Sequence, residues 1–327
     1  MVSTFGAGIR YDNSTIALEH AVKRHYLNTI VNGKLNQINA WIYADETYQL
    51  TKKLNLNLGV RSDIYNFNFK NYTFDTASGI AFKTIVNPKL NLTYNVNNRI
   101  QGFAKSGFGF HSNDARAAIS GSLQNTLARA FGNEIGATFK PTDKIIINLA
   151  FWTLALQSEL IYVGDEGIVE VAGRTRRLGM DLAFRFELTH CLFLDADLNI
   201  NRGKLADEPT NANRIPLAPT LTSIGGISYK KPNGLSASVR YRFMGDRAAI
   251  EDNSIIADGY FLMDALIKYK YKNYQVGLSA ENILNSTWRE AQFANESRLR
   301  EETVSVNEIH FTAGTPFFAK LNIGYTF

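Results

Sequence analysis

The sequence predicts an all-β chain, specifically a transmembrane antiparallel β-barrel of about fourteen strands. Three observations support this fold class. Apolar residues occupy every second position in one segment after another, and this period of two is typical of strands with a single apolar face. Short turns alternate with long connections along the chain, as in barrels with short periplasmic turns and long external loops. The 15 Tyr and 21 Phe suit the aromatic girdles of such a barrel.

The composition excludes several other classes. With 45% hydrophobic and 12% aromatic residues among 327, the chain carries too much apolar material to be disordered. No apolar run approaches the ~18 residues of a membrane-spanning helix. The net charge of +5 is spread along the chain, so we expect no nucleic-acid partner. Cys191 is the single cysteine, so it has no partner for an internal disulfide and no companion for a metal site.

The alternating segments can be followed in order along the chain. Residues 54–61 alternate Leu and Val with Asn, Gly and Arg, so a shift of one residue would place polar side chains on the apolar face. Residues 37–50 are also predicted as a strand, although the two faces of this segment are harder to distinguish. The predicted strands are residues 5–11, 37–50, 54–61, 90–96, 99–110, 130–139, 145–156, 177–188, 192–201, 221–229, 235–243, 261–270, 274–281 and 316–327.

Two kinds of connection separate these strands. The short ones, such as residues 51–53 and 140–143, have the polar composition of tight turns. The long ones are predicted to be external loops. They are the polar segment that carries His20 and His25, and residues 66–82, 111–129, 161–175, 203–219, 245–259 and 284–315.

Ionisable side chains occupy the positions between the apolar ones. In residues 177–188, the apolar positions alternate with four charged ones, which would be costly in a dry core but natural in a water-filled lumen. We therefore expect these groups to face the lumen, where they either solvate it or contact a ligand. The lumen-facing candidates are Arg61, Arg177, Asp181, Arg185, Asp195, Asp197, Arg240, Arg242, Asp264 and Glu281.

No catalytic, cofactor-binding or metal-binding arrangement is recognisable, so we expect neither an enzyme nor a cofactor. The glycines of residues 6–10 lack the third glycine of a phosphate-binding loop and lie on an alternating strand. Histidines near carboxylates occur at His20 and His25 beside Glu19, and at His111 beside Asp114, and we expect them to be solvated loop residues. Aromatic side chains in or near the predicted loops could stack on a ligand or lie in the upper girdle. They are Tyr65, Phe67, Phe69, Tyr72 and Trp288.

The last twelve residues form a strand that ends on an aromatic residue. Every second residue from Phe317 to Phe327 is apolar, and the residues between them are mostly polar. We expect Tyr325 and Phe327 to act as the C-terminal signal that the barrel assembly machinery recognises.

Several short motifs carry a family resemblance. They include Arg-Ile-Pro-Leu-Ala-Pro at 214–219, Glu-Asn-Ile-Leu-Asn at 281–285 and Gly-Val-Arg-Ser-Asp at 59–63. Residues 107–114, Asp264, residues 314–318 and residues 325–327 complete the set. Taken in their order along the chain, these motifs resemble those of the C-terminal part of a TonB-dependent outer-membrane receptor of the Bacteroidetes kind. The resemblance covers nearly all of residues 1–327.

The resemblance implies a barrel of about 22 strands closed around an N-terminal plug domain. Residues 1–6 have no basic region and no apolar stretch of a secretion signal. We therefore expect residues 1–327 to be the C-terminal portion of the barrel, without plug domain or signal peptide. The implied activity is energised uptake of a scarce ligand such as a ferric siderophore, a cobalamin or a glycan. The implied partners are outer-membrane lipid, the barrel assembly machinery and, through the missing N-terminal part, the TonB complex.

Two alternatives are kept open. A stand-alone barrel of about fourteen strands, working as a diffusion channel, would pair residues 5–11 with the last strand. An outer-membrane enzyme would need an outward Ser–His or carboxylate cluster near the membrane edge, and the sequence shows none.

Overall fold

The computed structural model describes residues 1–73, 78–112, 127–163, 168–171, 173–232 and 234–327. This part of the chain folds into β-strands joined by turns. It contains no helix long and apolar enough to cross a membrane.

Fourteen strands form one sheet, in the order β1-β2-β3-β4-β5-β6-β7-β10-β11-β12-β13-β16-β17-β20. This confirms the predicted fold class and number of strands. The bounds are β1 (Val2–Val22), β2 (His25–Gln49), β3 (Leu54–Asn71), β4 (Gly79–Asn97), β5 (Ile100–Ser112), β6 (Leu127–Phe139), β7 (Ile145–Leu156), β10 (Thr175–Thr189), β11 (Leu192–Leu205), β12 (Leu221–Lys230), β13 (Leu235–Met244), β16 (Tyr260–Tyr271), β17 (Tyr274–Glu281) and β20 (Phe318–Tyr325).

Three short hairpins lie in segments that were predicted to be long loops. They are β8 (Leu160–Val163) with β9 (Ile168–Val171), β14 (Arg247–Ala248) with β15 (Ile256–Ala257), and β18 (Arg289–Ser297) with β19 (Val306–Ala313). Local backbone pairing therefore gives these connections some order of their own.

The chain divides into two compact units. Unit 1 comprises Met1–Asn95, Phe103–Ile135 and Thr153–Arg176, and unit 2 comprises Val96–Gly102, Gly136–Trp152 and Arg177–Phe327.

In unit 1, the first two strands are much longer than predicted. The polar segment around His20 and His25 is not a loop, because β1 and β2 continue as an antiparallel hairpin up to a turn at Lys23 and Arg24, both with positive φ. Residues 66–71 likewise belong to β3. The alternation fades in the β1 and β2 extensions although the backbone pairing continues, since a strand that leaves the bilayer need not keep one apolar face.

Unit 1 also contains a buried aromatic cluster. Tyr65 and Phe67 stack with ring centroids 5.4 Å apart, and Phe110 meets Tyr65 edge-on. Leu35, Ala81 and Leu127 pack around them. Phe67 is 0% exposed and Phe69 is also buried, so the prediction that these are external loop aromatics is wrong for Tyr65, Phe67 and Phe69. Tyr72, by contrast, is exposed.

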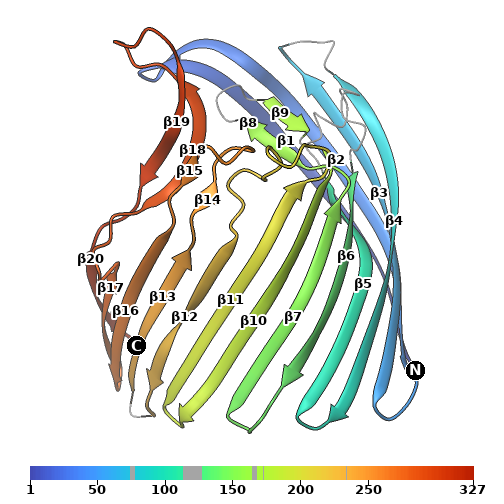
Figure 1. Cartoon of the computed structure of the whole chain (residues 1–327), viewed down its shortest axis with the longest axis vertical. Helices are drawn as coiled ribbons and strands as arrows, with labels where there is room; N and C mark the ends of the chain where they lie inside the picture. The colour runs from blue at the N-terminus through green and yellow to red at the C-terminus, as the bar shows by residue number, and fades with distance from the viewer. Residues whose placement is uncertain (74–77, 113–126, 164–167, 172, 233) are drawn as a thin grey trace. The chain divides into compact units, whose positions relative to one another are not determined.

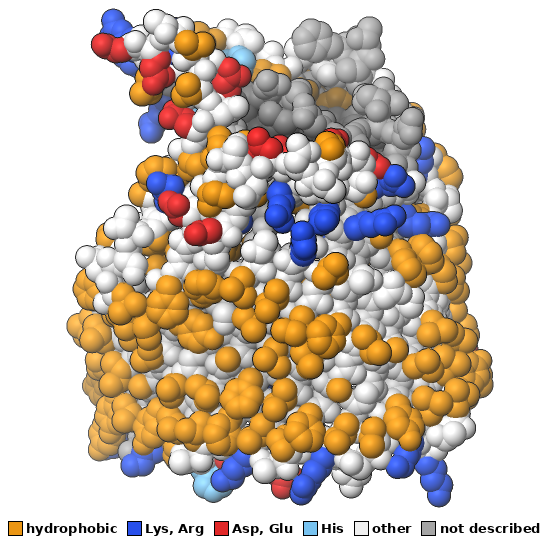
Figure 2. All heavy atoms as spheres, viewed as in Figure 1, with side chains coloured by type: hydrophobic (Ala, Val, Ile, Leu, Met, Phe, Trp, Pro, Cys, Tyr) orange, Lys and Arg blue, Asp and Glu red, His pale blue; other side chains and the backbone are white. Residues whose placement is uncertain are grey.

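In unit 2, the strands place mostly apolar side chains on one face of the sheet and the charged side chains on the other. Strands β10 to β13 run side by side, and their short connections lie at the lower end of the view in Figure 1. The register aligns Ile227 with Val239 and Val239 with Ala265 on one face. It aligns Asp197 with Ile224 and Ile224 with Arg242 on the other. Figure 2 shows the apolar face of these strands as a band of hydrophobic side chains, with Lys and Arg side chains along its lower edge.

The last strand completes unit 2 by pairing with β17. The register aligns Leu278 with Leu321, Val276 with Ile323 and Tyr274 with Tyr325. The apolar residues predicted for this strand thus continue the apolar face of β17.

Candidate functional site

Ion pairs line the polar face of unit 2. The Arg185 guanidinium donates to both carboxylate oxygens of Asp197, at 2.7 and 2.9 Å. Arg240 donates to Asp195 at 2.5 Å. These side chains stand on the face opposite the apolar one, as their alternation predicts.

The same face carries a second set of polar contacts. Arg242 reaches Asp264 at 3.3 Å, and the Asn199 amide donates to Asp181. Arg177 precedes Asp181 at even spacing along β10, and Glu281 lies opposite Phe318 at the end of β17. The arginines are between two fifths and one half exposed, so each pair contributes little stability, about 0 to 1 kcal/mol. This face therefore carries arginines and aspartates that neutralise each other in pairs and remain accessible to water.

In unit 1, Arg61 and Asp63 of β3 form a guanidinium–carboxylate pair. Arg61 donates twice to Asp63, each time at 2.7 Å, and Asp63 is 0% exposed. The Asn39 amide also donates to Asp63 at 3.3 Å, and the guanidinium lies 4.9 Å from the ring centroid of Trp41. A charged carboxylate can be buried here because a cation and an amide both donate to it.

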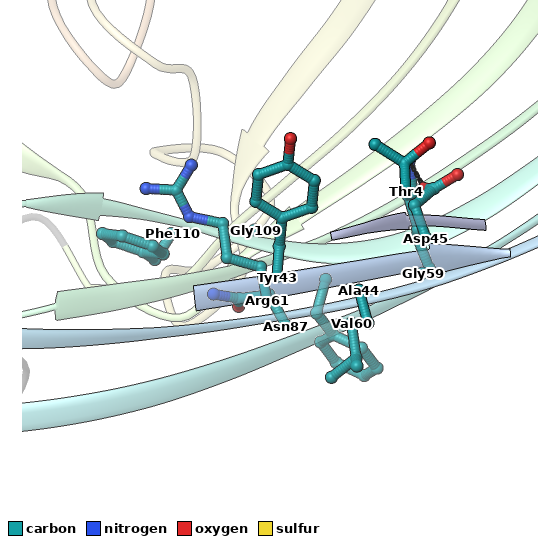
Figure 3. A pocket seen from close by; sticks show the side chains of 12 residues that line it. Thr4, Tyr43, Ala44, Asp45, Gly59, Val60, Arg61, Asn87, Gly109 and Phe110 are labelled. Atoms are coloured by element: carbon teal, nitrogen blue, oxygen red, sulfur yellow. Dashed lines mark ion pairs between the residues drawn. The ribbon is translucent and has the colours of Figure 1, made fainter. Parts of the chain in front are cut away.

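A pocket of about 780 Å³ opens beside this pair. The register aligns Tyr43 with Arg61 and Arg61 with Asn87 across three strands. Figure 3 shows Tyr43, Arg61, Thr4 and Asp45 pointing to the same side of the sheet. The pocket is lined by Thr4, Tyr43, Ala44, Asp45, Gly59, Val60, Arg61, Asn87, Lys89, Phe108, Gly109 and Phe110.

The charges of this pocket are also paired. The Lys89 ammonium lies 2.6 Å from Asp45, and Asn57 donates to the same carboxylate at 2.5 Å. Asn87 differs, because its Oδ1 is buried and has no hydrogen-bond partner among the described residues. A buried acceptor of this kind is costly unless a donor satisfies it.

Sequence reasoning found Arg61 but missed its neighbours Tyr43, Asp45, Asn87 and Lys89. A signal was available for Tyr43 and Asp45, since counting pairs outward from the short turn at residues 51–53 assigns them to the same face as Arg61. It did not reach Asn87 and Lys89, because β3 ends at Asn71 and β4 begins only at Gly79, so no short turn joins these two strands.

The glycines of the first strand have a packing role. A β-carbon added at Gly6 would clash with the Tyr43 ring, and one added at Gly8 would clash with the Trp41 ring. Cross-strand aromatic rings thus cover the two glycines, which accounts for them without a phosphate ligand.

In unit 2, motifs that lie far apart in the sequence meet around Asn282, which is 3% exposed and has a φ of 49°. Its backbone N–H donates to Asp264 at 2.9 Å, and its amide donates to the carbonyls of Ser286 and Thr315. Asn285 accepts from the Phe317 N–H at 3.0 Å. This Asn282 network therefore fixes the start of the last strand.

The remaining candidates form no ligand site in the described structure. Among the described residues, no group of three His, Cys, Asp or Glu could hold a metal ion. His20 lies opposite Asn28 in the first hairpin, and Asp114 falls outside the described residues. Trp288 donates to the Thr315 carbonyl and packs edge-on against Tyr260, so it belongs to the structure around the last strand.

Comparison with known proteins identifies the fold. Residues 3–283 match the family model described as TonB dependent receptor-like, beta-barrel. The ferric-catecholate import receptor Fiu of E. coli K12 has a TM-score of 0.76 at 16% identity, over 98% of this chain and 51% of that one. The ferric yersiniabactin uptake receptor FyuA of Yersinia pestis has a TM-score of 0.76 at 13% identity, over 99% and 51%. The FrpB iron transporter of Neisseria meningitidis has a TM-score of 0.66 at 13% identity, over 99% and 52%. The chain thus spans about half the length of these structures.

Proposed function

Because the chain belongs to the TonB-dependent receptor β-barrel family, we propose that it forms part of the wall of an outer-membrane receptor that imports a scarce ligand. Barrels of this family reside in the outer membrane. The observation that carries the proposal is the two-faced sheet of fourteen strands, with an exposed apolar face and a face of neutralised ion pairs. Such a sheet separates lipid from a hydrated interior.

The whole receptor is proposed to be of the Bacteroidetes kind, as the motifs at 214–219 and 281–285 indicate. Its ligand is a compound too large for diffusion porins, such as a ferric siderophore, a cobalamin or a glycan. Residues 1–327 contribute wall and external hairpins, and a plug domain encoded upstream would contact the TonB complex. This assignment of residues 1–327 to one part of the receptor is supported by the comparisons, in which the chain matches about half the length of each solved receptor.

The pocket beside Asn87 has a role within this proposal. A plug domain inside the barrel would meet the polar face of unit 1, where the half-exposed side chains of Arg61 and Lys89 line this pocket. The lumen-facing candidates of unit 2 then solvate the interior or pair with the same domain.

The test is the mass of the native protein in outer membranes, detected with an antibody against residues 284–315. A band of about twice the 36.6 kDa of this chain is expected for the C-terminal half of a plugged receptor. A heat-modifiable band at 36.6 kDa would refute the proposal and favour a stand-alone channel.

A further inference from the structure

The apolar face of unit 2 is not uniformly filled. A groove of about 560 Å³ crosses β12, β13, β16 and β17 on this face. Its lining consists of Ile227, Tyr229, Ala237, Ser238, Val239, Ala265, Leu266, Ile267, Leu278 and Ala280. Because the groove is almost entirely apolar and open to the outside of the sheet, a hydrocarbon chain fits it better than water does.

The groove exists because small side chains meet in register. Ala265 lies opposite Ala280, and Ala280 lies opposite Ala319, so three neighbouring strands carry methyl groups side by side. The next row toward the short turns holds the larger Ile267 and Leu278, which border the groove.

Lysines stand at one end of the groove. Lys231 follows the lining residue Tyr229 by two positions, which is about 7 Å along a strand. Lys272 occupies the adjacent short turn, with its ammonium 5.4 Å from the ring centroid of Tyr271. Neither lysine is paired with a carboxylate in the described part of the structure. Both turns belong to the end of the strands that carries the short connections, which is the periplasmic end in outer-membrane barrels.

We propose that this groove is a binding site for an anionic phospholipid of the periplasmic leaflet. One acyl chain occupies the groove over Ala265 and Ala280, and the phosphate of the headgroup lies between the ammonium groups of Lys231 and Lys272. Tyr271 and Tyr274 lie at the level where such a headgroup meets the hydrocarbon region. The inference rests on the outer-membrane location of the family and is independent of which ligand the receptor imports.

The experiment uses protein extracted from native outer membranes in mild detergent. It is offered equal amounts of phosphatidylglycerol and phosphatidylcholine with identical acyl chains, and retained lipid is counted by native mass spectrometry. The wild type should retain one phosphatidylglycerol in preference to phosphatidylcholine. Replacing both lysines (Lys231→Gln with Lys272→Gln) should reduce that preference roughly 30-fold, the combined effect expected of two lysines near an anionic lipid.

Matched variants separate a specific site from general attraction. Lys140→Gln with Lys144→Gln removes the same charge from another short turn and should leave retention unchanged. Ala265→Phe with Ala280→Phe fills the groove and should abolish retention of both lipids, whereas Ala40→Phe on β2 should have no effect. Heat-modifiable mobility on gels verifies that each variant is folded.

Three outcomes of the phospholipid measurements would overturn the site. They are equal retention of the two phospholipids by the wild type, the same loss in the Lys140 and Lys144 control as in the Lys231 and Lys272 variant, and retention by the folded groove-filled variant. Preferential retention of lipopolysaccharide in a parallel sample would also overturn it, because that lipid belongs to the opposite leaflet.

Discussion

Replacement of Asn282 by alanine should destabilise the barrel by about 4 kcal/mol. The change removes two hydrogen bonds donated by the side-chain amide and one accepted from the Ser286 N–H, each worth about 1 kcal/mol. It also leaves alanine in a left-handed conformation that asparagine tolerates better, which adds part of the roughly 1 to 2 kcal/mol cost of that conformation. Since Asn282 is 3% exposed, water does not replace the lost partners without further rearrangement.

The assay is urea unfolding in phospholipid vesicles, followed by the heat-modifiable shift of the folded barrel on gels. Asn282→Gly serves as the matched control, because it removes the same side-chain amide and, without a β-carbon, adopts the left-handed conformation at no steric cost. We expect the glycine variant to lie between the wild type and the alanine variant. Both variants should also expose the connection before β20 to protease, since the Thr315 carbonyl loses one of its two hydrogen bonds.

An alanine variant within about 1 kcal/mol of the wild type would refute this reasoning. It would mean that the Asn282 network forms after the last strand is already placed and contributes nothing to holding it.

Phe67→Ala should cost about 3 to 5 kcal/mol in the same unfolding assay, because Phe67 is fully buried, and a cost below 1 kcal/mol would show that the aromatic cluster is dispensable. In a Cys191→Ser background, a membrane-impermeant maleimide should label Asp181→Cys and not Met180→Cys in intact outer membranes, and the reverse pattern would place the ion pairs toward lipid. Deletion of Phe327 should lower the amount of folded protein in the outer membrane, measured by immunoblot against total protein, and an unchanged amount would exclude an assembly signal at this residue.

The sequence by itself determined the fold class, the number of strands and the two faces of most strands. This was possible because every residue in the membrane-spanning part faces either lipid or water, so a period of two is imposed locally and can be read one strand at a time. The charged candidates from Arg177 to Asp264 were recognisable for the same reason: each interrupts an otherwise apolar alternation.

Only the tertiary structure decided what depends on neighbouring strands. The extensions of β1 after Tyr11 and of β2 before Gln37 carry no clear alternation, and only the strand register shows that they pair with each other. Phe67 looks like a loop aromatic until packing against Leu127 buries it. Only the register shows that Asn87 lies beside Arg61, and only the packing shows that its Oδ1 is buried without a hydrogen-bond partner among the described residues. These features arise between residues far apart in the chain, where side-chain packing and register, not local pattern, set the environment.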